Sequence, residues 1–471
     1  MNLCDLDLVA LGELLARDEA SSREVVAAHI DRLDAVEPAI NGMVQQRPDW
    51  SRGIAADRDQ APSSGPFWGL PYAVKDCLEV EGWVTTFGTM GHADHVSACS
   101  ATVVNRLDAA GGVLLGLTNT PELGTSIETD NLIYGRTNNP IDLARSPGGS
   151  TGGGAALVKA GALPFVIGSD FGGGSRNTAN CCGLVAHRPS LGRVSAAGYL
   201  FGCSGMKGQM CRIAPLARSV RDLELVFQVI GGADPDDPKT DGVTGRQGAP
   251  RADGARIALV SGSPVAPPEP EIVEAIEAFG AALGPKYHVE MPDLHALFAE
   301  GGDIAYSLFS ADAGHLLRQA VEAATGLDAM SPSMAFWLES VGKLDERPAG
   351  DFIVLMSRWE AFRLTVNRLF ETYDFLVCPA SPTVAPHHGE TFDEAYFWRA
   401  IAYTTPFSLT ASPVLVVPVG IGRDGMPFCV QIVAPSWADE DLLAFGRSLQ
   451  EGEGEARALI ERALAVPVQV G

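Results

Sequence analysis

The first forty residues space their apolar side chains in the way that is typical of amphipathic helices. This pattern predicts two helices within residues 5–38. Ser21 and Glu24 begin the second helix as a capping box, in which each side chain accepts a hydrogen bond from the other residue's backbone N–H. The apolar stripe that follows is formed by Val26, Ile30 and Leu33. We expect Pro38 to close this helix.

Short apolar runs alternate with helical patterns over the next part of the chain. Residues 69–75 are predicted to form a short strand that ends in Lys75. Residues 101–116 are predicted to form a helix followed by a buried strand at 112–116. The alternation continues through 157–167, and it indicates a mainly parallel sheet.

The second half of the chain begins with residues 231–254, which are rich in Asp, Pro and Gly and typical of a surface connection. Regular elements are predicted again beyond it. They are a strand at 256–261, a helix at 271–283, a helical and irregular stretch at 300–350, a strand at 373–379, and a strand pair at 414–419 and 428–433 around a turn at 422–427.

These elements predict a single large α/β domain over residues 1–471. Its sheet is expected to be mixed, mostly parallel and twisted, with helices covering it. We expect residues 65–220 to be the segment that carries the functional site. Residues 255–350 are expected to be an excursion that shapes the mouth of the pocket.

Charge and cysteine usage exclude several classes of partner. The chain has 34 Lys and Arg against 58 Asp and Glu, a net charge of −24, so neither nucleic acid nor a membrane surface is an expected partner. No apolar run reaches the length of a membrane-spanning helix. Nine scattered cysteines are typical of reduced thiols, which favours the cytoplasm. We expect no metal and no cofactor, a small-molecule substrate, and leave a homodimer open.

Two glycine-rich stretches, at 146–154 and 168–176, are the main candidates for chemistry. Glycine lets exposed backbone N–H groups approach a ligand closely, so such stretches form oxyanion cradles or simply tight turns. The phosphate-binding pattern with Gly-Lys-Ser/Thr is absent. The segment 148–152 matches the nucleophile elbow of α/β-hydrolases, but the elbow needs a preceding strand and residues 139–147 are predicted to form a loop.

The order and spacing of three motifs resemble the amidase signature family. They are Lys75 in Ala-Val-Lys-Asp, Ser150 in Gly-Gly-Ser-Thr-Gly-Gly, and the Asp-x-Gly-Gly loop at 170–173. Further matching segments lie at 116–122, 182–183, 188–195, 214–218, 373–374, 379–383 and 406–410. The resemblance implies an amide or ester hydrolase with a Ser–cis-Ser–Lys triad, in which a second serine attacks the carbonyl carbon.

Carried over by position, the resemblance makes Lys75 the neutral base and Ser150 the serine that follows a cis peptide bond. A lysine acts as a base when burial lowers its pKa. The oxyanion hole would consist of the backbone N–H groups of the glycine-rich loop. These belong to Phe171, Gly172, Gly173 and Gly174.

The nucleophile position departs from the family pattern. The family reads Asp-x-Gly-Gly-Ser-x-Arg, whereas this chain reads Asp-Phe-Gly-Gly-Gly174-Ser175-Arg176. Gly174 therefore aligns with the nucleophile, Ser175 comes one residue late, and Asn177 and Asn180 also depart from the usual apolar segment. Loss of the nucleophile from a coupled triad typically costs about 10⁶-fold in rate.

Three accounts of this departure stay open. In the first, a shifted loop register lets Ser175 attack. In the second, Lys75 and Ser150 serve another reaction at a carbonyl-bearing substrate, such as proton abstraction, elimination, condensation or addition. In the third, the chain is a catalytically silent binding or partner subunit, or an inactivated variant.

Neighbouring residues have simpler interpretations. Cys181, Cys182 and Thr151 lie near the same loops, but burial explains them better than nucleophilic attack does. Asp170 is expected to organise the backbone of its loop. Arg176 fits structural pairing better than substrate recognition, although both are open.

Overall fold

The computed structural model describes residues 2–245, 254–312, 314–324, 329–343 and 346–470. Parts of the predicted connection 231–254 and excursion 255–350 therefore lie outside the described residues. Within these ranges one sheet of 11 strands has the order β1-β3-β2-β4-β6-β5-β10-β11-β9-β7-β8. The strands are β1 Met43–Gln46, β2 Pro71–Lys75, β3 Val113–Thr118, β4 Phe165–Asp170, β5 Val185–Arg188, β6 Arg212–Ala217, β7 Arg256–Leu259, β8 His288–Glu290, β9 Phe375–Pro379, β10 Val414–Ile421 and β11 Pro427–Val433.

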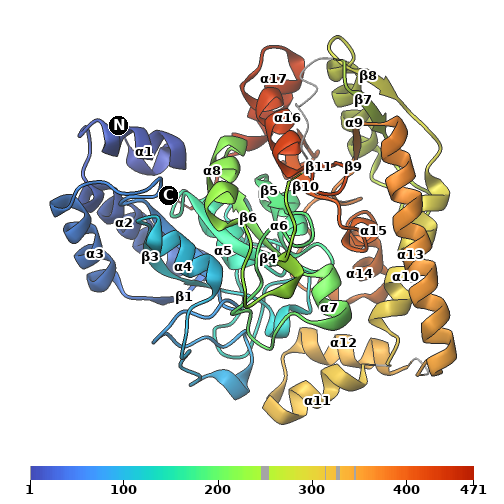
Figure 1. Ribbon diagram of the computed structural model, residues 1–471, viewed down its shortest axis with the longest axis horizontal. Coiled ribbons are helices and arrows are strands. Elements are labelled where there is room, and N and C mark those ends of the chain that lie inside the picture. Colours follow the sequence, from blue (N-terminus) through green and yellow to red (C-terminus); the bar gives the residue numbers. More distant parts are fainter. Residues whose placement is uncertain (1, 246–253, 313, 325–328, 344–345, 471) are drawn as a thin grey trace.

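Helices cover both faces of this sheet (Figure 1). Those before the connection are α1 Leu8–Ala16, α2 Ser22–Ile40, α3 Pro48–Gln60, α4 Thr102–Ala109, α5 Gly152–Lys159, α6 Gly174–Cys182, α7 Gly205–Met210 and α8 Val220–Ile230. Those after it are α9 Pro270–Leu283, α10 His295–Phe309, α11 His315–Ala324, α12 Pro332–Gly342, α13 Ala349–Thr372, α14 Glu394–Ile401, α15 Thr405–Ser408, α16 Asp439–Glu451 and α17 Glu455–Leu464.

Successive residues of the central strands contribute to two different apolar cores. In β2, Val74 packs into the core shared with α4 and α8, whereas Ala73 packs into the core shared with α2 and α5. In β4, Ile167 and Val166 divide in the same way. Because successive side chains of a strand point to opposite faces, this division requires helices on both sides. The predicted α/β domain with a mixed sheet is confirmed.

The prediction that most strand pairs of this mixed sheet are parallel was wrong. Parallel ladders join β2 to β3 and β4, and β7 to β8 and β9, whereas the other pairings are antiparallel. Helix–strand alternation predicts parallel neighbours only if successive strands lie side by side. Here α6 carries the chain from β4 to β5, and β6 returns between them, antiparallel to both.

Most predicted elements are present, with one clear error at a helix end. The capping box of Ser21 and Glu24 is formed at the start of α2, as predicted. Pro38 does not close this helix, which continues to Ile40. Near the end of a helix a proline removes one hydrogen bond without preventing the final turn. Asn41, in the left-handed conformation with φ of 56°, ends the helix instead.

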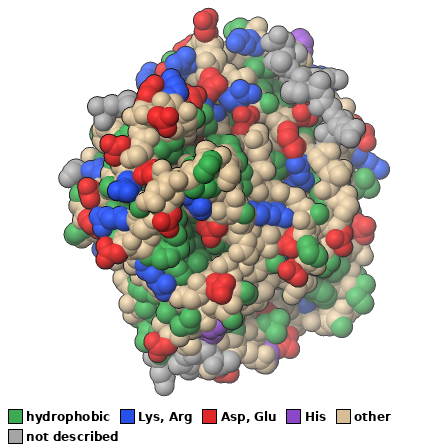
Figure 2. All heavy atoms as spheres, turned by 60° about the vertical axis from the view of Figure 1, so that its left-hand side comes forward, with side chains coloured by type: hydrophobic (Ala, Val, Ile, Leu, Met, Phe, Trp, Pro, Cys, Tyr) green, Lys and Arg blue, Asp and Glu red, His purple; other side chains and the backbone are tan. Residues whose placement is uncertain are grey.

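The surface carries charged side chains of both signs. On the face shown in Figure 2, acidic and basic side chains are interspersed, and no basic stripe crosses it. Across the described residues, none of the helices combines the length and the apolar character that a membrane span requires.

Candidate active site

Two parallel strands bring the first site residues to the same edge of the sheet. Lys75 ends β2, and Ser169 lies at the end of the adjacent strand β4. The Lys75 Nζ lies 2.7 Å from Ser150 Oγ and 3.0 Å from Ser169 Oγ. Ser150 comes from the loop before α5, so the fold unites a strand end with a glycine-rich loop 75 positions later in the chain.

Lys75 is fully buried, and its environment favours the neutral amine. Burial lowers the pKa of Lys75 from its ordinary value of 10.5, while Cys77, Cys211 and Asp170 oppose the shift electrostatically. No carboxylate among the described residues forms an ion pair with its Nζ. The ring of Phe87 lies 5.9 Å from the Nζ and completes an apolar side of the site.

The loop that carries Ser150 is attached on both sides. The peptide bond between Gly149 and Ser150 is cis. Thr120 Oγ1 donates a hydrogen bond to the Ser150 carbonyl at 3.0 Å. The Gly149 N–H donates to Asn177 Oδ1 at 3.4 Å, in the first turn of α6. These contacts hold Ser150 against the start of α6.

The loop before α6 offers backbone N–H groups. The N–H groups of Phe171, Gly172 and Gly173 donate no hydrogen bond to any described residue outside the helices and strands. Gly173 has a φ of 139°, which side-chain-bearing residues rarely adopt. Thr404 Oγ1 donates to the Gly172 carbonyl at 2.6 Å. Because C=O and the following N–H of a trans peptide point in opposite directions, this bond turns the Gly173 N–H away from Thr404.

The first turn of α6 orients the next peptide in the same manner. The Asn177 N–H donates to the Gly173 carbonyl at 2.6 Å, so the Gly174 N–H points out of the helix N-terminus. The positive end of the helix dipole adds to these donors. The arrangement suits a developing negative charge on a carbonyl oxygen.

Gly174 lies directly against Ser150. A β-carbon built on Gly174 would lie 2.7 Å from Ser150 Oγ and 2.6 Å from the Ser169 carbonyl oxygen. Both distances are shorter than normal carbon–oxygen contacts. The space beside Gly174 is therefore already filled, in part by the Ser150 hydroxyl.

Ser175 points to a different neighbourhood. Its hydroxyl is fully buried and donates to the Ala214 carbonyl at 3.2 Å. A weaker contact, at 3.4 Å, reaches the Ser169 carbonyl. Among the described residues, Ser175 Oγ has no hydrogen bond to Lys75 or Ser150. The Ser175 hydroxyl thus packs against the strands rather than into the Lys75 site.

Asp170 and Arg176 form a buried pair that organises the loop between them. Arg176 Nη2 and Nε donate to the two Asp170 oxygens at 2.8 and 3.0 Å. Burial would raise the pKa of Asp170, but the charges of Arg176 and Arg188 and the hydrogen bonds from Arg176 lower it to about 2. Arg176 also donates to the Thr404 carbonyl and to the side chains of Ser408 and Gln431. Its five N–H donors are thereby all used.

Comparison with known proteins decides the family. The family model described as Amidase matches residues 24–443. This chain belongs to the amidase family. A glutamyl-tRNA(Gln) amidotransferase subunit of Moorella thermoacetica is 32% identical over 477 residues, covering 94% of this chain and 96% of that protein. The corresponding protein of Salinispora arenicola is 30% identical, covering 96% of this chain and 98% of the relative.

Solved structures of other amidase signature enzymes have the same fold. The structure of 6-aminohexanoate cyclic dimer hydrolase with its substrate matches with a TM-score of 0.82 and 27% identity, covering 99% of this chain and 98% of the other. Fatty acid amide hydrolase matches with a TM-score of 0.82, covering 98% of this chain and 86% of the other. Its identity is 20%, so this second likeness concerns the fold alone.

The other nucleophiles near the loops of this amidase-family chain are inaccessible. Cys181 and Cys182 are buried in α6, and burial raises the pKa of Cys181 to about 12 and that of Cys182 above its ordinary value. Thr151 is fully buried and donates to the Ser169 carbonyl. A thiol acts as a nucleophile in its thiolate form, which burial disfavours here.

A group of half-buried aromatic side chains stands opposite the glycine-rich loop. The Phe171 ring packs edge-on against Phe309 of α10, with centroids 5.0 Å apart. Phe309 in turn contacts Trp337 of α12 and Trp398 of α14, with centroids 6.4 and 5.9 Å away. Residues from 255–350 thus contact the loop, while their role in shaping a pocket mouth stays a prediction.

A buried carboxylate fastens α12 to the core. Glu122 accepts hydrogen bonds from the Ser331 N–H at 2.7 Å and from Thr89 Oγ1 at 3.2 Å. The Ser331 side chain caps α12 by accepting from the Met334 N–H. Glu122 therefore connects the loop after β3 to the start of a helix some 200 residues later.

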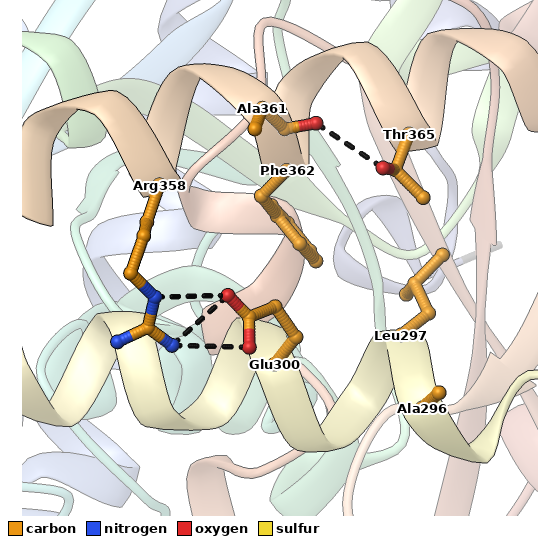
Figure 3. Close-up of a pocket in the computed structure, with 7 residues that line it drawn as sticks. All are labelled: Ala296, Leu297, Glu300, Arg358, Ala361, Phe362 and Thr365. Atoms are coloured by element: carbon orange, nitrogen blue, oxygen red, sulfur yellow. Dashed lines mark hydrogen bonds and ion pairs between the residues drawn. The ribbon is translucent and has the colours of Figure 1, made fainter.

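The surface hollow between α10 and α13 is a poor candidate for the site. Figure 3 shows the side chains that line it. Its volume is about 250 Å³. Its polar side is formed by Arg358, which donates to Glu300 at 2.9–3.2 Å and to Asp303 at 2.8 Å. Leu297 and Phe362 line its apolar side. Because its charged groups pair with each other and it shares no residue with the Lys75 site, we assign it no function.

The sequence analysis assigned no site role to three residues, although it noted Asn177 as a departure from the family pattern. Ser169, Thr404 and Asn177 hold Lys75, the Gly172 carbonyl and Gly149, respectively. Ser169 could have been predicted, because its hydroxyl lies near the end of a strand that pairs with β2. Thr404 could not, because it lies more than 200 residues after Gly172 in the sequence. Among the described residues there is no group of three or more His, Cys, Asp or Glu side chains that would hold a metal ion.

Proposed function

We propose that this protein is an enzyme that acts on the carbonyl carbon of a small amide-bearing substrate. Lys75 is the base, Ser150 is its hydroxyl partner, and the N–H groups of Gly173 and Gly174 stabilise the developing oxyanion. The 2.7 Å contact between the buried Lys75 Nζ and Ser150 Oγ carries the proposal. Burial that lowers the pKa of Lys75 is what a lysine base requires.

Gly174 takes the place of the family's nucleophilic serine in this proposal. The match in order around the Asp-x-Gly-Gly loop and the contact of Gly174 with Ser150 support this assignment. Hydrolysis by a serine at position 174 is therefore excluded. Either another group attacks the carbonyl carbon, or the Lys75–Ser150 pair serves proton abstraction, elimination, condensation or addition at a carbonyl-bearing substrate.

Ser175 and Arg176 are structural in this proposal. The Ser175 hydroxyl is directed to the Ala214 carbonyl, which argues against a shifted register in which it attacks. Arg176 has no donor left for a substrate, because its N–H groups bind Asp170, Gln431, Ser408 and the Thr404 carbonyl. Its task is to hold the shape of the loop that offers the N–H groups.

Turnover of a panel of small amides and esters, read by mass spectrometry, tests the proposal. Lys75→Met should lower kcat/KM by about 10⁴-fold or more while the melting temperature holds within a few degrees. Lys159→Met is the matched control, because Lys159 is also buried with its pKa lowered, to about 8, but its amine donates to the Leu464 carbonyl rather than to a hydroxyl. Turnover that survives Lys75→Met, or no turnover of any substrate, would contradict the proposal.

A partner subunit without activity of its own is the second candidate. Two observations favour it: the missing hydroxyl at Gly174, and curated relatives that are amidotransferase subunits. In that case the protein alone would turn over none of the amides and esters, with or without Lys75→Met. It would instead co-purify in a complex of defined stoichiometry.

A further inference from the structure

The space beside Gly174 shows which group can attack in its place. A serine side chain at position 174 would start from a β-carbon. A β-carbon at Gly174 would come within 2.6 Å of the Ser169 carbonyl and 2.7 Å of Ser150 Oγ. The Ser150 hydroxyl therefore lies directly against the position from which the family's nucleophilic side chain would extend.

Accessibility separates Ser150 from the other hydroxyls around the loop. The exposed fraction is 8% for Ser150, 2% for Ser169, and 0% for Ser175 and Thr151. Ser150 is also within hydrogen-bond distance of the Lys75 amine, whereas Ser175 and Thr151 bond to backbone carbonyls. Ser150 is thus both the most exposed of the four hydroxyls and in direct contact with the base.

We propose that Ser150 itself is the nucleophile, so that a Lys75–Ser150 pair replaces the three-residue arrangement of the family. This inference rests on the proposed function and assigns its attacking atom. The Thr151 N–H donates to the Gly174 carbonyl at 3.3 Å, and a β-carbon built on Gly174 would lie 2.7 Å from Ser150 Oγ, so Ser150 lies against the first residue of α6. The attacking oxygen and the oxyanion donors are therefore on adjacent segments.

The reaction balances with water as the only co-reactant. Ser150 Oγ bonds to the amide carbon as its proton passes to the neutral Lys75 amine, and the carbonyl electrons move to the oxygen held by the loop. The C–N bond then breaks, and the leaving nitrogen takes the proton from Lys75. Water attacks the resulting ester, gives its proton to Lys75, and releases the carboxylic acid as Ser150 regains its proton.

The assignment also gives a role to the neighbouring side chains that hold Lys75 and Ser150 in position. Ser169 holds Lys75 Nζ from a second side, at 3.0 Å, so the amine is aimed at Ser150 by two contacts. Thr120 and Asn177 fix the backbone on either side of Ser150. A nucleophile must be held within a narrow range of positions, and these bonds restrict its loop.

Labelling of the full-length protein with an alkyl fluorophosphonate, followed by peptide mapping, tests the assignment. We expect phosphonylation of Ser150, a labelling rate at least about 10⁴-fold lower in Lys75→Met, and an unchanged rate in the matched variant Ser175→Ala. In Ser150→Cys, alkylation of residue 150 by iodoacetamide should depend on Lys75 in the same way. Near-ultraviolet circular dichroism establishes that each variant is folded.

The outcomes separate this inference from the proposed function. Label on Ser175, or none on Ser150, would overturn Ser150 as the nucleophile. If substrates are nevertheless turned over with dependence on Lys75, the proposed function stands and another group attacks. If neither label nor Lys75-dependent turnover is found, both are wrong.

Discussion

Replacing Gly174 by alanine measures how tightly the start of α6 is packed against the Ser150 loop. The added β-carbon would lie 2.6 Å from a backbone oxygen of β4 and 2.7 Å from Ser150 Oγ. Overpacking of this kind costs about 1–3 kcal/mol, because a backbone atom cannot simply rotate away. Alanine in a helix is favoured over glycine by about 0.5–1 kcal/mol, which offsets part of that cost.

The chain offers a matched control in Gly350→Ala. Gly350 also lies in the first turn of a helix, α13, and a β-carbon there meets nothing within 4 Å. This variant should gain the helix preference alone, about 0.5–1 kcal/mol. The difference between the two variants then isolates the contact cost, about 1–3 kcal/mol against Gly174→Ala.

Differential scanning calorimetry can resolve this difference. Unfolding entropy of about 2.1 cal/mol/K per residue gives about 1 kcal/mol/K for 471 residues, so Gly174→Ala should melt about 1–3 °C below Gly350→Ala. Equal melting temperatures for the two variants would refute the conclusion that Ser150 and β4 fill the space beside Gly174. They would also remove the main support for Ser150 as the attacking group.

Four further predictions concern the base, the buried pair of Asp170 and Arg176, and α12. The kcat/KM of the wild type should rise with pH and level off, with an inflection below the ordinary lysine pKa of 10.5, because the base acts once Lys75 has lost its proton; an inflection at or above 10.5 would contradict this. Arg176→Ala should destabilise the protein by about 3–5 kcal/mol in calorimetry, because the buried Asp170 charge loses its bidentate partner and keeps only the Arg188 ion pair at 3.5 Å; a loss of activity without a loss of stability would instead indicate substrate binding. The stability that Asp170 contributes, with its pKa lowered to about 2, should be fully present above about pH 4 and be lost as the pH falls toward 2 in the wild type but not in Asp170→Asn. Glu122→Ala should speed amide hydrogen exchange in α12 while that of α13 is unchanged, since the Ser331 N–H loses its acceptor; unchanged exchange in α12 would refute that role.

Features encoded within a few residues were predictable from the sequence. The capping box at Ser21, the strand that ends in Lys75 and the β10–β11 pair follow from local spacing and turn residues, and the structure contains all three. The end of α2 was misjudged because Pro38 was treated as a stop, whereas Asn41 supplies the left-handed cap.

Features that depend on which strands become neighbours could not be predicted in the same way. The order β4-β6-β5 arises from packing across the sheet, and helix–strand alternation alone does not reveal it. The same holds in the site. Thr404 donates to the Gly172 carbonyl and Asn177 accepts from the Gly149 N–H, and both contacts join segments that lie far apart in the sequence. The family motifs singled out Lys75 and Ser150 by their order in the chain, and the structure brings these two side chains together at 2.7 Å; their catalytic roles stay a proposal.

The partners of Arg176 have a consequence for how the protein is made. Its loop leaves the ribosome early, but the guanidinium donates to Thr404, Ser408 and Gln431, which are translated more than 200 residues later. Until then a charge destined for full burial lacks most of its acceptors, and a nascent chain cannot finish the loop. A fragment of residues 65–220, although it contains Lys75 and Ser150, should therefore emerge without an assembled site, and a chain cut short before about residue 431 should be cleared by cellular proteases.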